Sequence, residues 1–351
     1  MFRLMEAFFD IAYLGLIVSL GLRLLLEERK SAKLFGFTAL LLGLGDAFHL
    51  IPRVISQLSP GGFEAHTALL SWGEFITSIT MSVFYLLFYF YYRNLSKDYD
   101  KRKDYSVYAL VLIRILLILL PQNAWGAQGS YLFGLIRNIP FALLGLLLII
   151  WTGRRRRVEG LKYTSPLIAA SFLFYLPVVI GSRFFPLLGI LMIPKTIAYV
   201  LLVAVGYRYF IGGSSPLDLL KLSITFLFMG LAGGVFFREF TKIYGWNEKS
   251  RLAFIHPHLL VLGFLFFLLL YFILREKEEN LLFFQKLLLY VTGLTWTVSA
   301  LMVRGIYEIL SRKGGLFPDA ALSGMAGIGH ILLGTGLILV MLQILRREAR
   351  A

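Results

Sequence analysis

Long apolar runs recur along the whole chain and are separated only by short polar stretches. A helix needs about 20 mainly apolar residues to cross the hydrocarbon core of a bilayer. Eleven segments approach or exceed that length, at 7–26, 34–55, 67–92, 105–121, 132–152, 163–185, 187–211, 216–237, 252–274, 282–309 and 320–345. The pattern therefore predicts an all-α, polytopic integral membrane protein with about eleven transmembrane helices.

The composition supports the same fold class. Of the 351 residues, 58% are hydrophobic and 16% are charged, whereas soluble domains carry about 25% charged residues. A soluble fold of this length has too little interior to hide so much apolar surface, so the lipid bilayer is the expected partner. The net charge of +15 comes from short basic tracts between apolar runs. We therefore expect no nucleic-acid binding, which needs basic residues gathered on one docking element.

The basic tracts also predict an orientation. They follow the first, third and fifth predicted helices, whereas the loops 56–66 and 122–131 contain no Lys or Arg. Because cytoplasmic loops concentrate Lys and Arg, the N-terminus is expected outside and these tracts inside. With an odd number of helices, the C-terminus is then cytoplasmic. The largest tract, Arg154-Arg155-Arg156-Arg157, is expected to attract anionic lipid. The tyrosines at 89, 91 and 92 are expected to form an aromatic belt at the interface.

One break in composition divides the chain. The stretch Gly-Gly-Ser-Ser-Pro at 212–216 resembles a linker. It predicts a seven-helix membrane domain at 1–211 and a four-helix membrane domain at 216–351. The chain contains no cysteine, which excludes thiolate metal sites, iron–sulfur clusters and covalently attached haem. No phosphate-binding loop, nucleophile elbow or HExxH stretch is present, so the sequence does not decide whether the protein is an enzyme.

The four-helix part contains four blocks that carry a family resemblance. They read Gly-Leu-Ala-Gly-Gly-Val-Phe-Phe-Arg-Glu-Phe-Thr-Lys at 230–242, His-Pro-His-Leu-Leu-Val-Leu-Gly at 256–263, Val-Arg-Gly-Ile at 303–306 and Ser-Gly-Met-Ala-Gly-Ile-Gly-His-Ile-Leu-Leu at 323–333. In this order and spacing, residues from about 220 to 346 resemble Domain of Unknown Function 2871, a bacterial four-helix membrane family. The resemblance implies a multi-pass protein of the bacterial inner (cytoplasmic) membrane, and it implies no activity.

Polar residues of these four helices are expected to meet at one depth, towards the extracytoplasmic side. Charged groups inside spanning helices usually turn inward, pair or line a site. On the predicted last helix, Ser323, Gly327, His330 and Gly334 share one face at helical spacing. Small residues on both sides of a histidine leave room for a neighbouring helix or for a flat ligand. The converging side chains are Arg238, His256, His258, Arg304 and His330.

A non-covalent haem b is the sharpest hypothesis for this cluster. His258 and His330 would supply axial nitrogens, with His256 beside them and Arg238 or Arg304 on the propionates. The His-Pro-His segment is similar to the His-x-His of haem-copper oxidase catalytic subunits, which also need further histidines that these helices do not supply. This interpretation favours a sensory or redox-accessory role. The alternative is a network of polar side chains that only packs the helices.

The seven-helix part holds a second set of intramembrane polar residues. Asp46, His49 and Arg53 fall on one helix face. Together with further acidic and basic residues they predict an outward-opening pocket for a small anionic or hydrophobic ligand. The remaining members of this predicted pocket are Glu74, Arg114, Arg137 and Lys195.

Three other interpretations of these residues stay open. The first treats them as buried ion pairs, Asp46–Arg53 and Glu74–Arg137, that fix helix packing. A transporter or channel for a small anion would use the basic residues as a path across the membrane. A metal-dependent membrane lipid hydrolase would hold its metal with Asp46, His49 and Glu74.

Overall fold

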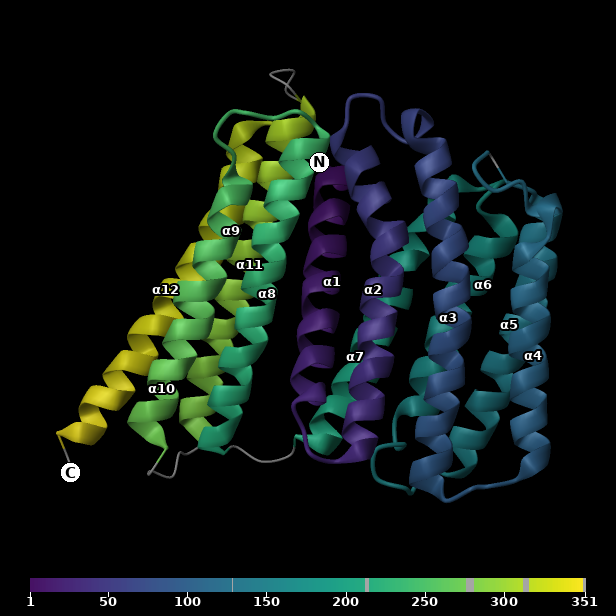
Figure 1. The fold of residues 1–351 in the computed structure, drawn as a ribbon, viewed down its shortest axis with the longest axis horizontal. Helices are drawn as coiled ribbons and strands as arrows, with labels where there is room; N and C mark the ends of the chain where they lie inside the picture. Colours follow the sequence, from purple (N-terminus) through teal and green to yellow (C-terminus); the bar gives the residue numbers. More distant parts are fainter. Residues whose placement is uncertain (128, 212–214, 276–280, 312–315, 350–351) are drawn as a thin grey trace. The chain divides into compact units, whose positions relative to one another are not determined.

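The protein is described by a computed structural model that covers residues 1–127, 129–211, 215–275, 281–311 and 316–349. Figure 1 shows long helices joined by short connections, and these residues contain no β-strand. The long helices are α1 (Phe2–Leu25), α2 (Lys30–Leu58), α3 (Thr67–Ser96), α4 (Lys101–Leu119), α5 (Tyr131–Arg154), α6 (Thr164–Gly181), α7 (Met192–Phe210), α8 (Pro216–Ile243), α11 (Leu281–Ser311) and α12 (Asp319–Glu348).

One further helical rod is built from four consecutive pieces. A 3₁₀ turn (Arg251–Phe254) leads into α9 (Ile255–Pro257), a π-helix (His258–Leu265) and α10 (Phe266–Leu274). Short 3₁₀ turns also lie at Glu64–His66, Pro121–Asn123 and Pro186–Leu191. The last of these is the tight connection that separates the sixth and seventh predicted helices.

Ten helical segments among the described residues are long and apolar enough to cross a membrane. The fourth predicted span, 105–121, corresponds to α4, which forms a helix of 19 residues but is not among those ten. Its first turn consists of Lys101, Arg102, Lys103 and Asp104, so few of its residues form an uninterrupted apolar stretch. The all-helical, multi-span character of the prediction is confirmed, with ten candidate spans in place of eleven.

The chain divides into two compact units, which are described separately below. Unit 1 comprises residues 1–19, 53–65 and 213–351, and unit 2 comprises residues 20–52 and 66–212. The predicted linker at 212–216 lies partly outside the described residues, and the predicted domain boundaries stay a prediction. Unit 1 includes, besides α8 to α12, the first part of α1 and the last part of α2.

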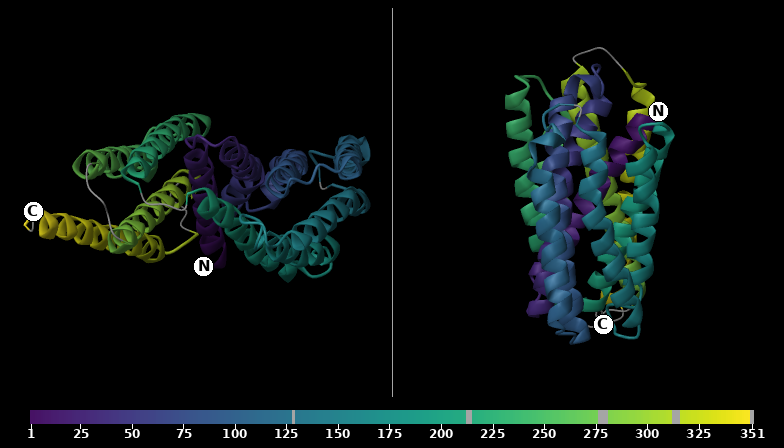
Figure 2. Two further views of the ribbon diagram at one scale, coloured as in Figure 1. Left: turned by 90° about the horizontal axis from the view of Figure 1, so that it is seen from below. Right: turned by 90° about the vertical axis from the view of Figure 1, so that its right-hand side faces the viewer.

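Unit 1 contains α8, the rod that includes α9 and α10, α11 and α12. Each of these runs antiparallel to the next along the chain (Figure 1). As a result, the end of α8, the start of α9, the end of α11 and the start of α12 lie at the same end of the unit. Side-chain contacts confirm this arrangement, because Arg304 of α11 donates to Asp319 of α12 and Glu308 accepts from the Arg251 backbone. The view from below in Figure 2 (left) shows the rod of α9 and α10 (green) and α12 (yellow) as separate rods of this bundle.

Unit 2 has an aromatic core. Tyr85 and Phe88 of α3 are fully buried, and Tyr85 packs edge-on against Phe141 of α5. The predicted aromatic belt at 89, 91 and 92 is wrong, since these three tyrosines are at most 1% exposed. Their hydroxyls donate to Asp104, to the Gly160 carbonyl and to Asp98, all near one end of the unit. Half-buried acceptors therefore hold the three rings inside the helix bundle.

Asp98 ties the end of α3 to the start of α4. It accepts hydrogen bonds from the Tyr92 hydroxyl at 2.7 Å and from Lys103 Nζ at 2.5 Å. Burial raises the pKa of Asp98, but the bonds from Lys103 and Tyr92 outweigh that effect and hold the pKa below its usual value of 3.8. Because the folded-state pKa is lowered, the stabilisation is present at neutral pH and is lost as the pH falls below about 3.8.

We therefore expect Asp98→Asn to lower the stability of the protein at pH 7 by about 1 kcal/mol, since the ion pair is partly exposed. The difference in stability between this variant and the wild type should decrease as the pH is lowered from 5 to 3. Thermal unfolding in detergent at several pH values measures this, with the exposed Glu159→Gln as a control. A gap that stays constant with pH would contradict a role for the Asp98 charge.

Candidate functional site

His258 and His330 approach each other from two different helices of unit 1. His258 is the first residue of the π-helix and His330 lies in α12. Their ring centres are 6.4 Å apart and the ring planes are nearly perpendicular, at 89°. His258 is half-buried and His330 is exposed. The predicted pairing of these two histidines is thus present in the structure.

The hydrogen bonds of the two histidine rings define which nitrogen carries the proton when the ring is neutral. His258 Nδ1 lies 2.7 Å from the Phe254 carbonyl oxygen, and His330 Nδ1 lies 2.8 Å from that of Ala326. A carbonyl oxygen can only accept, so in each ring Nδ1 carries the proton and donates it. In a neutral imidazole Nε2 is then the unprotonated nitrogen, with a lone pair available to a metal. Metal-binding histidines in proteins are commonly oriented by such a bond to a backbone carbonyl.

The separation of the rings fits two axial ligands of one metal atom. A metal held on a straight line between two imidazoles places the ring centres about 6 Å apart, because each metal–nitrogen bond is about 2 Å long and each ring centre lies about 1 Å behind its nitrogen. The observed 6.4 Å is close to this value.

The flank of His330 is open. A Cβ atom added at Gly327 or Gly334, one turn to either side of His330, would meet no atom within 4 Å. The same is true of Gly324. The predicted stripe of small residues therefore does not serve close helix packing. It leaves an uncovered strip of α12 on either side of the histidine, which suits a flat apolar ligand.

His256 has a different environment from His258. Its Nδ1 lies 2.9 Å from the carbonyl oxygen of Gly230 in α8, and the ring packs against Gly234 of the same helix. In the His-Pro-His segment, His256 thus connects α9 to α8 through a hydrogen bond, and His258 lies beside His330 of α12. Pro257 between them has no N–H, so the helical ladder is interrupted there, and the π-helix begins at the next residue.

The two arginines predicted to meet propionates differ in their availability. Arg304 is engaged by three side chains: it donates to Asp319 at 2.7 Å, to Ser323 at 2.9 Å and to Glu308 at 3.4 Å. Arg238, one turn beyond Gly234 on α8, is 74% exposed and pairs only with its neighbour Glu239. Arg304 therefore serves mainly to join α11 to α12, and Arg238 is the cation that is accessible to a ligand.

The residues of the predicted second pocket do not all belong to one unit. Arg53 lies in unit 1 and forms an ion pair with Glu6 of α1, rather than with the predicted partner Asp46. Asp46 and His49 belong to unit 2, where Asp46 is buried. The other predicted ion pair, Glu74–Arg137, is present in unit 2, and Arg137 also donates to Asn123.

Three basic side chains of unit 2 contact aromatic rings. The Arg114 guanidinium lies 3.5 Å from the ring centre of Phe141, and that of Arg137 lies 4.3 Å from the ring of Trp125. Lys195 Nζ is 5.4 Å from the ring centres of both Tyr175 and Tyr199. No described group of three or more His, Asp or Glu residues is arranged to hold a metal ion. The set Asp46, His49 and Glu74 required by a lipid hydrolase is therefore not assembled as a metal site.

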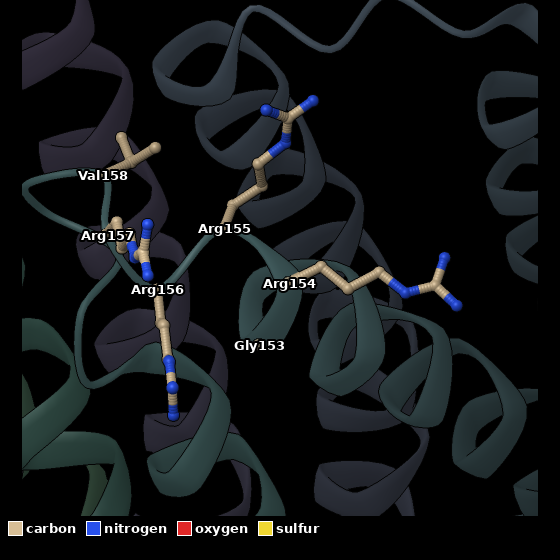
Figure 3. A pocket seen from close by; sticks show the side chains of 6 residues that line it. All are labelled: Gly153, Arg154, Arg155, Arg156, Arg157 and Val158. Carbon is tan, nitrogen blue, oxygen red and sulfur yellow. The ribbon is translucent and has the colours of Figure 1, made fainter.

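The basic tract after α5 lines an open hollow of about 400 Å³. Figure 3 shows Arg154, Arg155 and Arg156 extending in three different directions. Because the guanidinium groups diverge, they form a diffuse positive surface at this end of unit 2 instead of a site that encloses one ligand.

The part of the chain that contains His258 and His330 matches a known protein family. Residues 218–347 match the family described as protein of unknown function (DUF2871). The predicted resemblance is confirmed. The N-terminal part matches no family, and no curated protein and no solved structure matches the chain. All of the polar contacts between α8, α9, α11 and α12 described above lie within the matched residues.

Sequence reasoning missed the π-helix. Its only signal in the sequence is Pro257, directly before it, and proline by itself indicates an interruption without indicating the kind of helix that follows. The buried hydroxyl pair of Tyr85 and Tyr199, 3.0 Å apart in unit 2, was missed as well. Tyrosine in an apolar run gives no signal that distinguishes a core position from an interfacial one.

Proposed function

We propose that the matched helices of unit 1 form a membrane-embedded binding module for a b-type haem, with His258 and His330 as axial ligands. The observation that carries this proposal is the pair itself, 6.4 Å apart with both Nδ1 atoms donating to backbone carbonyls. A haem of this type is held without covalent attachment, which agrees with a chain that contains no cysteine.

The number of ligands favours haem over a bare metal ion. Zinc and copper sites need three or four protein ligands, and none of the described His, Asp and Glu residues form a group of three or more that could hold a metal. Two histidines are sufficient only for a metal that brings its own in-plane ligands. The macrocycle of haem supplies four nitrogens, so the two imidazoles complete its coordination.

The surroundings of the pair support a flat, apolar ligand. Val261 and Leu265 on the π-helix and Ile331 on α12 are exposed, and the Gly327 and Gly334 positions are uncovered. The edge of a porphyrin bears carboxylates, for which Arg238 is the accessible cation. Iron with both axial positions occupied by protein has no open site for a substrate, so the module suits electron transfer or redox sensing better than catalysis.

The proposed setting is the bacterial inner membrane, with the N-terminus outside and the C-terminus in the cytoplasm, an orientation that requires α4 to cross the membrane in addition to the ten candidate spans. The ten apolar helices support insertion into a membrane, and the basic loops after the first, third and fifth predicted helices support this orientation. In that orientation the histidine pair lies in the extracytoplasmic half of the bilayer, at the end of unit 1 that holds Arg304 and Asp319.

Absorbance of the purified protein tests the proposal. The full chain, produced with haem supplied and purified in detergent, is expected to show a Soret band and about one haem per chain by the pyridine haemochrome assay. Metal analysis should find iron in the same ratio, with zinc and copper in trace amounts. Protein that stays colourless and whose spectrum does not change when haem is titrated into it would refute the haem site.

A further inference from the structure

Arg114 of α4 is a buried cation, and two of its three nitrogens are not satisfied by the residues that the structure describes. The side chain is 3% exposed, and its Nε and Nη1 atoms have no hydrogen-bond partner among the described residues. One face of the guanidinium is covered by the Phe141 ring. A buried, unpaired charge costs several kcal/mol, and such arginines inside spanning helices are usually paired or line a site.

The groups that interact electrostatically with Arg114 are three tyrosines and a second cation. They are Tyr175, Tyr199, Tyr85 and Arg137. No carboxylate is among these main neighbours. The closest acidic group in the network is Glu74, which already pairs with Arg137. The tyrosine hydroxyls are engaged with Asn138 and with each other, so Nε and Nη1 of Arg114 are the donors left for a negative charge.

A count of the charged residues around Arg114 also indicates that negative charge is missing there. The cations of this connected cluster are Arg114, Arg137 and Lys195, and its carboxylates are Glu74 and Asp46. Three positive and two negative charges leave one net positive charge in this cluster, in which Arg114 is buried and Glu74 is exposed. One monovalent anion would neutralise it.

We infer that unit 2 contains a binding site for a small monovalent anion at Arg114. The anion accepts hydrogen bonds from Nε and Nη1 along the guanidinium edge, while Phe141 covers one face of the group. The surplus of a single charge selects a monovalent ion over a divalent one. The tight aromatic packing of Tyr85, Phe141 and Phe172 around this region restricts the ligand to a few atoms, such as chloride, nitrate or formate. This site is independent of the histidine pair in unit 1.

Thermal unfolding in different salts tests the inference. The purified full chain in detergent is titrated with sodium chloride, nitrate or formate, and sodium gluconate keeps the ionic strength constant. A ligand that binds only the folded state raises the unfolding midpoint in a saturable manner. We expect such a rise of several degrees with at least one of the three anions. Identical midpoints in all salts would overturn the inference.

Variants show whether the effect originates at Arg114. Arg114→Gln should abolish the anion-dependent rise, while its midpoint in gluconate should equal or exceed that of the wild type because an unpaired buried charge has been removed. Arg155→Gln, an exposed arginine of the same unit, is the matched control and should keep the full rise. Arg114→Lys should keep the rise but need at least about tenfold more anion, since lysine lacks the planar fork.

Two further outcomes would overturn the assignment. One is an Arg114→Gln protein that still shows the saturable rise, which would place the anion elsewhere. The other is an equal loss of the rise in Arg155→Gln, which would show a diffuse charge effect. If Arg114→Gln does not fold, the wild-type titration and the Arg114→Lys shift still decide the question.

Discussion

Replacing His258 or His330 with alanine is expected to weaken haem binding by at least about 100-fold, because each variant removes one of the two proposed ligands to the iron. Purified variants should contain little haem, and the haem that remains should be five-coordinate. Five-coordinate iron has an open position, so carbon monoxide should bind rapidly to the variants and slowly or not at all to the wild type. Added imidazole should occupy the vacated position and restore the wild-type spectrum.

The matched control for these variants is His256→Asn. His256 belongs to the same His-Pro-His segment, but its Nδ1 bonds to the Gly230 carbonyl of α8 instead of facing His330. An asparagine amide can keep that hydrogen bond. We therefore expect His256→Asn to retain about the wild-type haem content. Equal haem loss in all three variants would indicate a folding defect, and full haem retention in the two alanine variants would exclude these histidines as ligands.

Introducing leucine at Gly329 is expected to destabilise unit 1 strongly, whereas the same change two residues earlier, at Gly327, is expected to be nearly neutral. A Cβ atom at Gly329 would lie 2.7 Å from Thr297 Oγ1, 2.8 Å from Trp296 Cδ1 and 2.9 Å from the Thr297 backbone nitrogen. At Gly327 nothing lies within 4 Å. Overpacking usually costs about 1–3 kcal/mol, and a clash with backbone cannot be relieved by a rotamer change, so the upper end of that range applies.

Thermal unfolding of the haem-free variants in detergent measures this difference without a contribution from the ligand. Gly293 of α11 offers a second test of the same contact, since its Cβ would lie 2.3 Å from the Leu333 backbone nitrogen of α12. Gly293→Ala should therefore be destabilising as well. Gly327→Leu should keep the fold yet reduce haem binding, because the leucine would cover the open strip beside His330. Similar stability of the Gly327 and Gly329 variants would contradict the close α11–α12 packing.

The helical architecture could be predicted from the sequence because it depends on properties that are local to each segment. An apolar run of about 20 residues has to satisfy its own backbone hydrogen bonds in lipid, and only a helix does so within one segment. The pairing of His258 with His330 also followed from local information. In antiparallel helices joined by short loops, residues near matching ends lie at the same depth.

The choice of packing face could not be predicted in this way. The helix α12 carries two series of glycines, and the spacing of Gly327 and Gly334 left open whether they make room for a neighbouring helix or for a flat ligand. In the structure the other series, Gly329 and Gly336, contacts α11, and the series at Gly327 and Gly334 is open. Both series have the same helical period, so only the position of the neighbouring helix distinguishes them.

The sequence by itself thus determined a chain of apolar helices, the family match of the C-terminal part and the shared level along unit 1 at which His258 and His330 lie. The tertiary structure alone decided which polar groups are paired. Arg304 and Arg114 look alike in the sequence, as single arginines in apolar helices. Arg304 is satisfied by Asp319, Ser323 and Glu308, whereas Arg114 has no partner for its Nε and Nη1. The reason is that an ion pair depends on a few ångströms between residues of different helices, a distance that no local pattern encodes.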